Sequence, residues 1–275
     1  MPLFVLYQMH RIIAKPEAKS ALEFIAESVE DLLQEQLYIS RTTRPLHPGS
    51  SFSHLLHMVY SYFEVTTPPQ EGPPGAAPRR SLTGRWRRAT DYSRYADLKF
   101  KPRRFKQDDK WTVLDIDLQG GTLYIPFLRV GSSTLTMLRN MMALEEQQEK
   151  RPVTAYCYFM SQLACKEVDV DLLQRANILE HFLGSDEQAA QGFAELCNGV
   201  ALDMDNLERN YLKPIWHKLD NRCRTPVRTF MGFFRQRYWN NVFYQLAFLA
   251  VLLLFLSELT QAIYAVIAYH KPPKA

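Results

Sequence analysis

The chain has 275 residues, 47% of them hydrophobic, and its 33 Lys and Arg residues against 29 Asp and Glu residues leave a net charge of only +4. This hydrophobic content excludes a wholly disordered chain. The length allows one folded domain of about 240 residues beside a membrane anchor. Four cysteines occur without any C-x-x-C pair. Their spacing argues against a zinc knuckle or a disulfide framework and favours reduced thiols packed as small apolar groups.

Residues 1–65 are predicted to form the N-terminal helical part of the domain. Apolar residues recur at helical spacing in residues 3–13, 21–34 and 51–63. His54 and His57 lie three residues apart in the last of these helices, so they could share one face as metal ligands. Because no E-x-x-H pattern accompanies them, we interpret them as surface or half-buried histidines and assign no metal.

Residues 66–90 are predicted to be a disordered linker rich in Pro, Gly and Arg, because TTPPQEGPPGAAP cannot bury a core. A basic run follows from Arg79 to Lys106, and its candidates for stacking on bases are Trp86, Tyr92 and Tyr95. No nucleic-acid fold surrounds this run, so we expect no nucleic acid. We prefer the interpretation that this basic run contacts anionic lipid headgroups. A solvated loop that binds nothing is an equal alternative.

Residues 91–225 are predicted to form a helical domain with one β-hairpin at residues 112–128. Alternating apolar residues flank Gly120–Gly121 there, which is a hairpin signature. Apolar spacing and capping residues predict the helices that follow. The first is capped by Ser132 or Ser133 and runs through residue 148, and the others lie near residues 152–164, 168–179, 186–198 and 205–224.

Asp115 and Asp117 form a D-x-D pair in this hairpin, a pattern that can hold a metal and a sugar nucleotide. Both would point to one face of a strand. Without a second carboxylate cluster or a phosphate loop, we interpret them as part of a solvated strand face. Glu145 and Glu146 are expected on an exposed helix face. Asp169, like other acidic residues at helix starts, is expected to complement the helix dipole.

Cys157 and His181 could serve as a thiol and its base, but nothing local marks a nucleophile. We therefore assign no catalytic residue and no cofactor.

Residues 242–269 carry one formal charge, Glu258, and begin with VFYQLAFLAVLLLFLS. About 20 apolar residues span a bilayer core of roughly 30 Å, so the sequence predicts a single transmembrane helix. The residues expected within the span include Val242, Leu249, Leu254 and Tyr264. A short tail, residues 270–275, follows, so we expect a single-pass, tail-anchored protein.

Basic residues precede this span, in a juxtamembrane segment at residues 226–241 and just before it. They are Arg222, Arg224, Arg228, Arg235 and Arg237, against only Lys271 and Lys274 after the span. Lys and Arg favour the cytoplasmic side. The N-terminal domain is therefore expected in the cytosol, with these arginines against anionic lipid.

Glu258 allows two interpretations. The helix can shift so that Glu258 approaches the far interface, which we prefer slightly. Alternatively, Ser257, Glu258 and Gln261 form a polar seam that pairs with another helix, including by self-association.

Several segments in order resemble the plant "domain of unknown function 247" family. They are MPLFVL, HLLHMVYSYF, TDYSRYADLKFK, WTVLDIDLQGGTLYIPFL, LRNMMALEEQ and GSDEQAAQGFAELCNGV, ahead of an apolar C-terminal helix. Members of the family usually carry a further N-terminal region with a G-P-Y-H segment, so this chain resembles a shortened member. The resemblance implies a plant protein at the plasma membrane and supplies no catalytic residues, and some members are linked to self-incompatibility.

We therefore predict a mainly α protein with one β-hairpin (α+β) and a single C-terminal transmembrane helix. The expected function is non-enzymatic: protein interaction or recognition at a membrane, with an unknown protein partner. The alternative is an enzyme of unrecognised type that uses acidic pairs such as Asp115 and Asp117. A deep pocket that collects two or more of Asp115, Asp117, Glu145, His54 and His57 would favour the enzyme.

Overall fold

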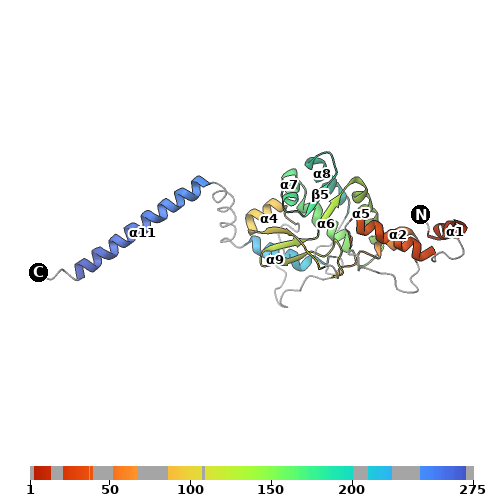
Figure 1. Cartoon of the computed structure of the whole chain (residues 1–275), viewed down its shortest axis with the longest axis horizontal. Coiled ribbons are helices and arrows are strands. Elements are labelled where there is room, and N and C mark those ends of the chain that lie inside the picture. Colours follow the sequence, from red (N-terminus) through yellow and green to blue (C-terminus); the bar gives the residue numbers. More distant parts are fainter. Residues whose placement is uncertain are drawn as a thin grey trace.

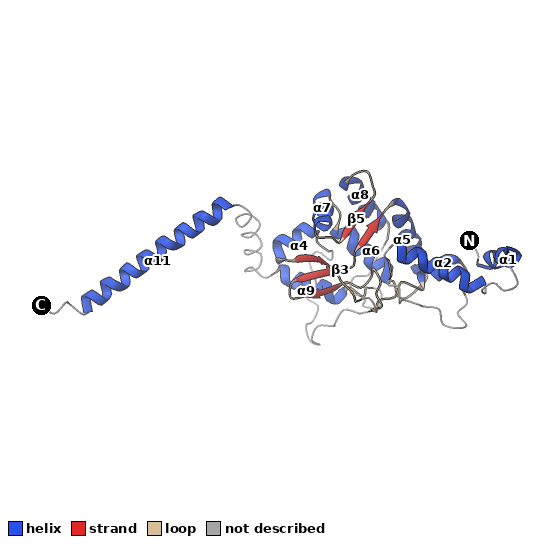
Figure 2. Cartoon of the chain, viewed as in Figure 1, coloured by secondary structure: helices blue, strands red, loops and turns tan. Residues whose placement is uncertain are grey.

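The structure is a computed structural model, and it describes residues 3–13, 21–36, 38–39, 52–66, 86–106, 109–200, 210–224 and 242–270. Figure 1 shows a folded part built mostly of helices, with one long helix, α11, apart from it. Figure 2 shows that the strands are short and lie within the folded part. The predicted class, mainly α with a few strands, is confirmed.

The first helices lie at the end of the folded part that is at the right in Figure 1. They are α1 (Leu3–Ile13) and α2 (Ala21–Glu35), which pack against each other, and the short α3 (Leu55–Tyr60) follows. The backbone N–H of Leu3 donates to the carbonyl of Ser53 at 3.3 Å. Since Leu3 is buried and Leu6 and Tyr7 pack on the core, one side of α1 is attached to the domain.

The predicted hairpin is confirmed. Its strands are β2 (Asp117–Gln119) and β3 (Thr122–Ile125), which pair antiparallel around Gly120–Gly121. Both glycines have positive φ, at 56° and 92°, a conformation that glycine adopts at little cost. The hairpin gains a third strand that periodicity did not reveal, β1 (Lys99–Pro102), which runs parallel to β3.

A second small sheet joins β4 (Leu128–Val130) in parallel to β5 (Leu179–His181). The sequence prediction extended a helix over residues 168–179, and this is wrong at its end. The helix is α7 (Glu167–Arg175), and the chain then turns at Asn177, whose φ is 54°. Asn tolerates this left-handed conformation, and the backbone N–H of Ile178 bonds the carbonyl of Leu173 at 3.0 Å.

Helices complete the domain around one buried apolar cluster. They are α4 (Ala89–Ala96), α5 (Ser132–Glu145), α6 (Pro152–Leu163), α8 (Asp186–Leu196) and α9 (Lys213–Cys223). Nine of the twelve residues of α6 are buried, because its sequence is apolar or small on nearly every side and other elements must surround it. The folded part resumes at Trp86, before the predicted linker boundary at residue 90. The Trp86 indole packs edge-on against Phe159, with ring centroids 4.8 Å apart. Residues 67–85, most of the predicted linker, lie outside the described residues.

α11 spans Val242–His270. Within it, residues Leu246–Val266 have a mean hydropathy of 2.1, and every one of these side chains is exposed. The helix is thus long and apolar enough to cross a membrane, and no described part of the domain covers it.

Candidate functional site

Three buried carboxylates share one arrangement, in which each accepts hydrogen bonds from both the backbone N–H and the hydroxyl of a single threonine. Glu145 binds Thr154, Asp169 binds Thr90 and Asp115 binds Thr66, with donor–acceptor distances between 2.6 and 3.0 Å. All three carboxylates are 0% exposed. The neutral donors compensate the desolvation of the Glu145 and Asp115 carboxylates. For Asp169 they reach only Oδ1, and its buried Oδ2 has no hydrogen-bond partner among the described residues. All three acids join separate segments of the fold.

Two of these carboxylates cap helices from a distance. Thr154 and Val153 lie in the first turn of α6, and their N–H groups both bond Glu145, at 2.7 and 2.8 Å. Thr90 lies in the first turn of α4 and bonds Asp169 at 3.0 Å. The residues that precede α6 and α4, Arg151 and Arg88, provide no side-chain cap. A carboxylate from elsewhere in the chain therefore satisfies the free N–H groups, where the helix dipole favours negative charge.

The interpretation of Asp115 as part of a solvated strand face is wrong. Asp115 precedes β2 and is fully buried. Its Oδ2 accepts from the backbone N–H of Thr112 at 2.7 Å and from the Thr66 hydroxyl at 2.7 Å. Asp117 is half-buried in β2, and its Oδ1 accepts from the N–H of Leu118 at 2.8 Å. The two carboxylates thus occupy different environments, because the chain turns just before Asp115 and the strand begins only at Asp117.

The prediction of an exposed Glu145 is also wrong, although its neighbour Glu146 is exposed. Besides Thr154 and Val153, Glu145 accepts from the hydroxyl of Tyr60 at 2.8 Å. Burial raises the pKa of the Glu145 carboxyl, while these hydrogen bonds oppose the shift. Burial likewise raises the pKa of Tyr60. Periodicity placed Glu145 on the outer face because the helix following it, which covers it, cannot be seen in the local pattern.

The two histidines are half-buried, as predicted. His54 precedes α3, and its Nδ1 accepts from the backbone N–H of His57 at 3.1 Å. This bond caps α3, which is a structural role. Among the residues that the structure describes, no group of three or more His, Cys, Asp or Glu side chains is placed to hold a metal ion.

Cys157 is fully buried in α6, and burial raises the pKa of its thiol well above the ordinary value. A protonated buried thiol is a poor nucleophile. His181, the imagined base, instead places its Nε2 2.7 Å from Oδ1 of Asp186. Burial also raises the pKa of Cys197 and Cys223 to about 11. Cys157, Cys165 and Cys197 are free thiols, which agrees with the prediction of reduced thiols.

Two of the aromatic residues considered for stacking on bases, Trp86 and Tyr92, belong to the core, at 4% and 1% exposure, and Tyr95 is half-buried. Their aromatic faces are used for packing because α4 brings this segment onto the domain.

Two of the five arginines considered for lipid contact fall within the described residues. Arg222 is half-buried, and its Nε donates to the carbonyl of Ala96 at 2.8 Å. Arg224 is exposed and pairs with Asp220 at 2.9 Å. Arg228, Arg235 and Arg237 lie outside the described residues, as does the whole predicted juxtamembrane segment at residues 226–241.

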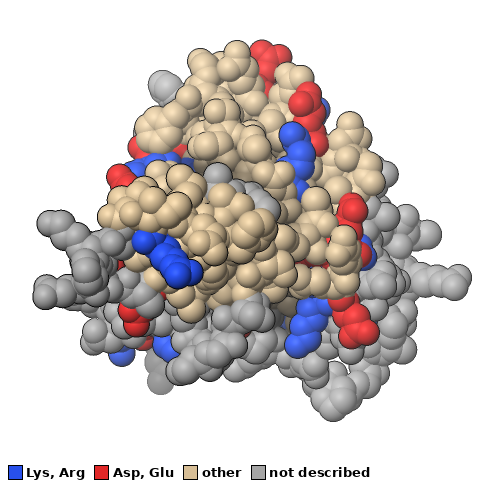
Figure 3. Space-filling model, turned by 90° about the vertical axis from the view of Figure 1, so that its right-hand side faces the viewer, with Lys and Arg blue, Asp and Glu red and all other residues tan. Residues whose placement is uncertain are grey.

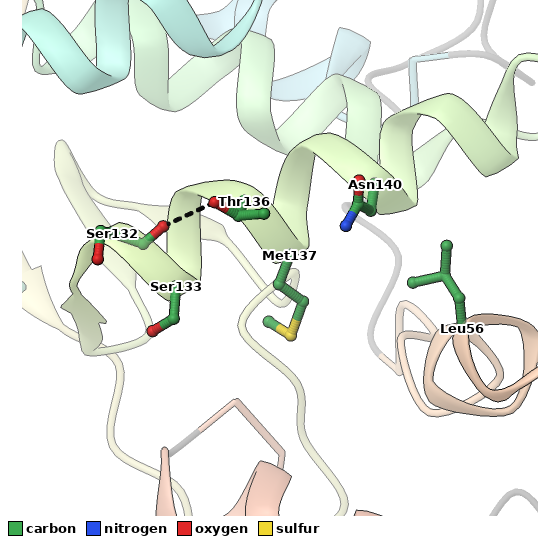
Figure 4. Close-up of a pocket in the computed structure, with 6 residues that line it drawn as sticks. All are labelled: Leu56, Ser132, Ser133, Thr136, Met137 and Asn140. Atoms are coloured by element: carbon green, nitrogen blue, oxygen red, sulfur yellow. Dashed lines mark hydrogen bonds between the residues drawn. The ribbon is translucent and has the colours of Figure 1, made fainter. Parts of the chain in front are cut away.

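A small groove of about 410 Å³ lies between α3 and α5 (Figure 4). It is lined by Leu56, Ser132, Ser133, Thr136, Met137 and Asn140. None of these side chains titrates near neutral pH, so the groove offers hydrogen bonds and apolar contact but no acid or base.

The most distinctive exposed feature of the folded part lies on α1 and α2. Six large apolar side chains are at least 49% exposed there, and we name them the N-terminal apolar surface: Phe4, Met9, Ile12, Ile13, Phe24 and Leu32. The rings of His10 and Phe24 lie 5.3 Å apart, which joins the two helices across this surface. Figure 3 views this end of the molecule and shows mostly uncharged residues over its described surface, with charged side chains mainly toward the edges.

Exposed large apolar side chains are almost confined to this surface and to α11. Among the described residues, Val168 and Phe182 are the exceptions. Such concentration marks a contact with lipid or protein, since monomeric soluble proteins rarely expose large apolar patches. The sequence pattern did not reveal the N-terminal apolar surface, because the spacing of apolar residues along a helix does not show which of them the fold covers.

The fold and these surfaces define a class: a mainly helical domain joined to one exposed apolar helix of membrane-spanning length. The chain belongs to the plant DUF247 family, described as plant protein of unknown function, whose sequence model matches residues 1–257. This confirms the resemblance seen in the sequence.

The chain is also similar to the putative UPF0481 protein At3g02645 of Arabidopsis thaliana, with 30% identity over 108 residues. The match covers 38% of this chain and 19% of that relative, so the chain corresponds to only a part of its length. No solved structure matches the chain.

Proposed function

We propose that this chain is a non-enzymatic protein anchored to the plasma membrane by α11, with its helical domain in the cytosol, where it binds another protein through the N-terminal apolar surface. One observation carries the proposal. The exposed large apolar side chains of the described residues gather in two places, α11 and the α1–α2 end.

The anchor is supported by the exposure of the whole stretch Leu246–Val266. Transfer of apolar surface from water to hydrocarbon gains about 25 cal/mol per Å², and a helix of this length matches the bilayer core. The basic residues before α11 favour a cytosolic domain. The membrane of residence rests on the family resemblance.

Protein binding is supported by the two-sided character of α1. One side is buried on the domain at Leu3, and the other exposes Phe4 and Ile12, at 65% and 82%. A helix that is apolar on both sides is stable when both are covered. Exposed acids flank the apolar side chains of α2, among them Asp31 and Glu35. The expected partner therefore presents apolar side chains with basic residues around them.

The non-enzymatic role is supported by the structural use of the acidic residues. Asp115 and Glu145 are occupied by threonine, backbone and tyrosine donors, and the groove between α3 and α5 contains neither of them. The alternative, an enzyme that uses Asp115 and Asp117 as a pair, requires both carboxylates on one face of a strand. Asp115 instead precedes β2 and is buried, which counts against this alternative.

Two sets of experiments test the proposal, and the first concerns the anchor and its orientation. Alkaline extraction of membranes that contain the full chain should leave it in the pellet, and protease treatment of sealed vesicles should remove an N-terminal tag. Release by alkali would contradict the anchor, and protection of the tag would contradict the orientation.

The second set uses proximity labelling in plant tissue with the full chain. Ile12→Glu combined with Ile13→Glu should remove specific neighbours that the wild type labels. Val168→Glu, at an exposed apolar residue on α7, is the matched control and should retain them. Equal labelling by all three chains would contradict the role of the N-terminal apolar surface.

A further inference from the structure

The apolar helix α11 has two different faces. Within Leu246–Val266, at about 100° of rotation per residue, most of the small and polar residues fall within an arc of roughly 100°, together with Leu254, and Ala262 and Thr260 fall outside it. We name this arc the small-polar seam, and its members are Ala247, Ala250, Ser257, Glu258, Gln261 and Ala265. Within Leu246–Val266, the opposite face carries only large apolar residues, among them Leu249, Leu252, Leu256, Leu259 and Ile263.

The polar side chains of the seam differ in their hydrogen bonding from the Thr260 hydroxyl. Thr260 lies off the seam, and its hydroxyl donates to the carbonyl of Ser257 at 2.8 Å, so it is satisfied within its own helix. Ser257, Glu258 and Gln261 make no side-chain hydrogen bond to any described residue, and all three are exposed. The seam therefore brings unsatisfied hydrogen-bonding groups into an apolar span, where they need a partner.

Glu258 lies eight residues before the end of the apolar stretch at Val266, which is about 12 Å along the helix axis. A shift of the helix toward the far interface would reduce the cost of this charge. Such a shift leaves the alignment of Ala247, Ala250 and Ala265 with Glu258 unexplained. Close approach of a second helix accounts for both features, because small residues let two backbones come together and polar residues bond across the contact.

We propose that α11 pairs with α11 of a second copy of this chain, in parallel, through the small-polar seam. This inference rests on the proposed membrane anchor. Two copies inserted in the same direction place residues of the same number at the same depth. Glu258 and Gln261 lie on opposite sides of the seam's midline, about 60° apart around the helix. A two-fold axis therefore brings Glu258 of one copy toward Gln261 of the other.

The pairing is self-complementary in hydrogen bonding as well. The Gln261 amide and the Ser257 hydroxyl are donors, and the Glu258 carboxyl is an acceptor. All three lie within about one helical turn, so each copy supplies what the other lacks. A two-fold interface requires this property, since the same patch serves both sides.

Cysteine cross-linking in membranes tests the proposal with the full chain, whose four native cysteines all precede α11. Ala250→Cys lies on the seam, and Leu252→Cys lies on the opposite face as the matched control. Under mild oxidation, and after subtraction of the signal from the parent chain, the seam variant should form at least fivefold more covalent dimer. Adding Glu258→Leu with Gln261→Leu should reduce that yield severalfold, whereas adding Leu256→Ala should not.

Equal cross-linking from both faces, or none from either, in chain that stays in the alkali-washed membrane pellet would overturn the pairing and leave the anchor intact. An unchanged yield with Glu258→Leu and Gln261→Leu would overturn the polar contact. Release of the chain by alkali would instead overturn the anchor itself, so the two failures are distinguishable.

Discussion

The Glu145 carboxylate accepts hydrogen bonds from the backbone N–H and the hydroxyl of Thr154, at 2.7 and 2.6 Å, in a part of the core that is closed to water. The same two-donor arrangement recurs where Asp169 meets Thr90 and where Asp115 meets Thr66. The paired residues are 9, 79 and 49 positions apart. These contacts fix α6, α4 and the chain after α3 to the rest of the domain.

Replacement of Glu145 by Gln should destabilise the folded domain by about 3 kcal/mol. A Gln side chain puts an amide N–H₂ group in place of one acceptor oxygen, so buried donors of α6 face another donor. Chemical denaturation of the full chain in detergent micelles measures the loss. Glu146→Gln, at an exposed neighbour, is the control and should change stability by less than about 0.5 kcal/mol. Similar losses in the two variants would contradict the structural role of Glu145.

The stability that Glu145 confers should depend on pH in a defined direction. Burial raises the pKa of its carboxyl in the folded chain above the ordinary value, so the folded state binds this proton more tightly than the unfolded state does. The part of its stabilisation that depends on this proton is therefore complete below about pH 4.3, the ordinary pKa, and is lost as pH rises through the folded-state pKa. The free-energy advantage of wild type over Glu145→Gln should shrink with rising pH. An advantage that grows over this range would contradict the shift.

Asp115→Asn and Asp117→Asn should have unequal effects. Asp115 is buried and accepts three hydrogen bonds from Thr66 and Thr112, so its replacement should cost about 2–3 kcal/mol of stability. Asp117 is half-buried and accepts a hydrogen bond from the backbone N–H of the adjacent Leu118. Its replacement should therefore cost less than about 1 kcal/mol of stability. Thermal denaturation of both variants decides the matter. A stable Asp115→Asn chain would show that Asp115 is not a structural residue.

Gly121 should not tolerate a side chain, whereas Gly120 should. Gly121 has φ of 92°, a conformation that L side chains rarely adopt, and a Cβ there would displace the guanidinium end of the Arg222 side chain. Gly120 has φ of 56° with open space beside it. Gly121→Ala should therefore cost about 2 kcal/mol or more, and Gly120→Asn, which suits this left-handed conformation, should cost less than about 1 kcal/mol. Unfolding of the two variants side by side gives the comparison, and equal costs would argue against the packing of Arg222 over the hairpin turn.

Much of the fold was predictable from local patterns. Helical spacing found α1 and α2, and the Gly120–Gly121 pair found the β2–β3 hairpin. Short strands with distant partners were not predictable, since β1 is only four residues long and its residues pair with residues of β3 that lie 23 positions further along the chain. The third pairing, β4 with β5, joins segments about 50 residues apart, and no local signal encodes such a contact.

The sequence by itself determined the apolar helix at residues 242–269, because a long run with one charge needs no tertiary contact to show its preference for lipid. It also determined the family, through motifs in a fixed order. Only the tertiary structure decided the roles of Asp115, Glu145 and Asp169, because a carboxylate looks the same in the sequence whether water or a threonine solvates it. Burial depends on which distant segments cover a residue, and that information exists only once the chain has folded.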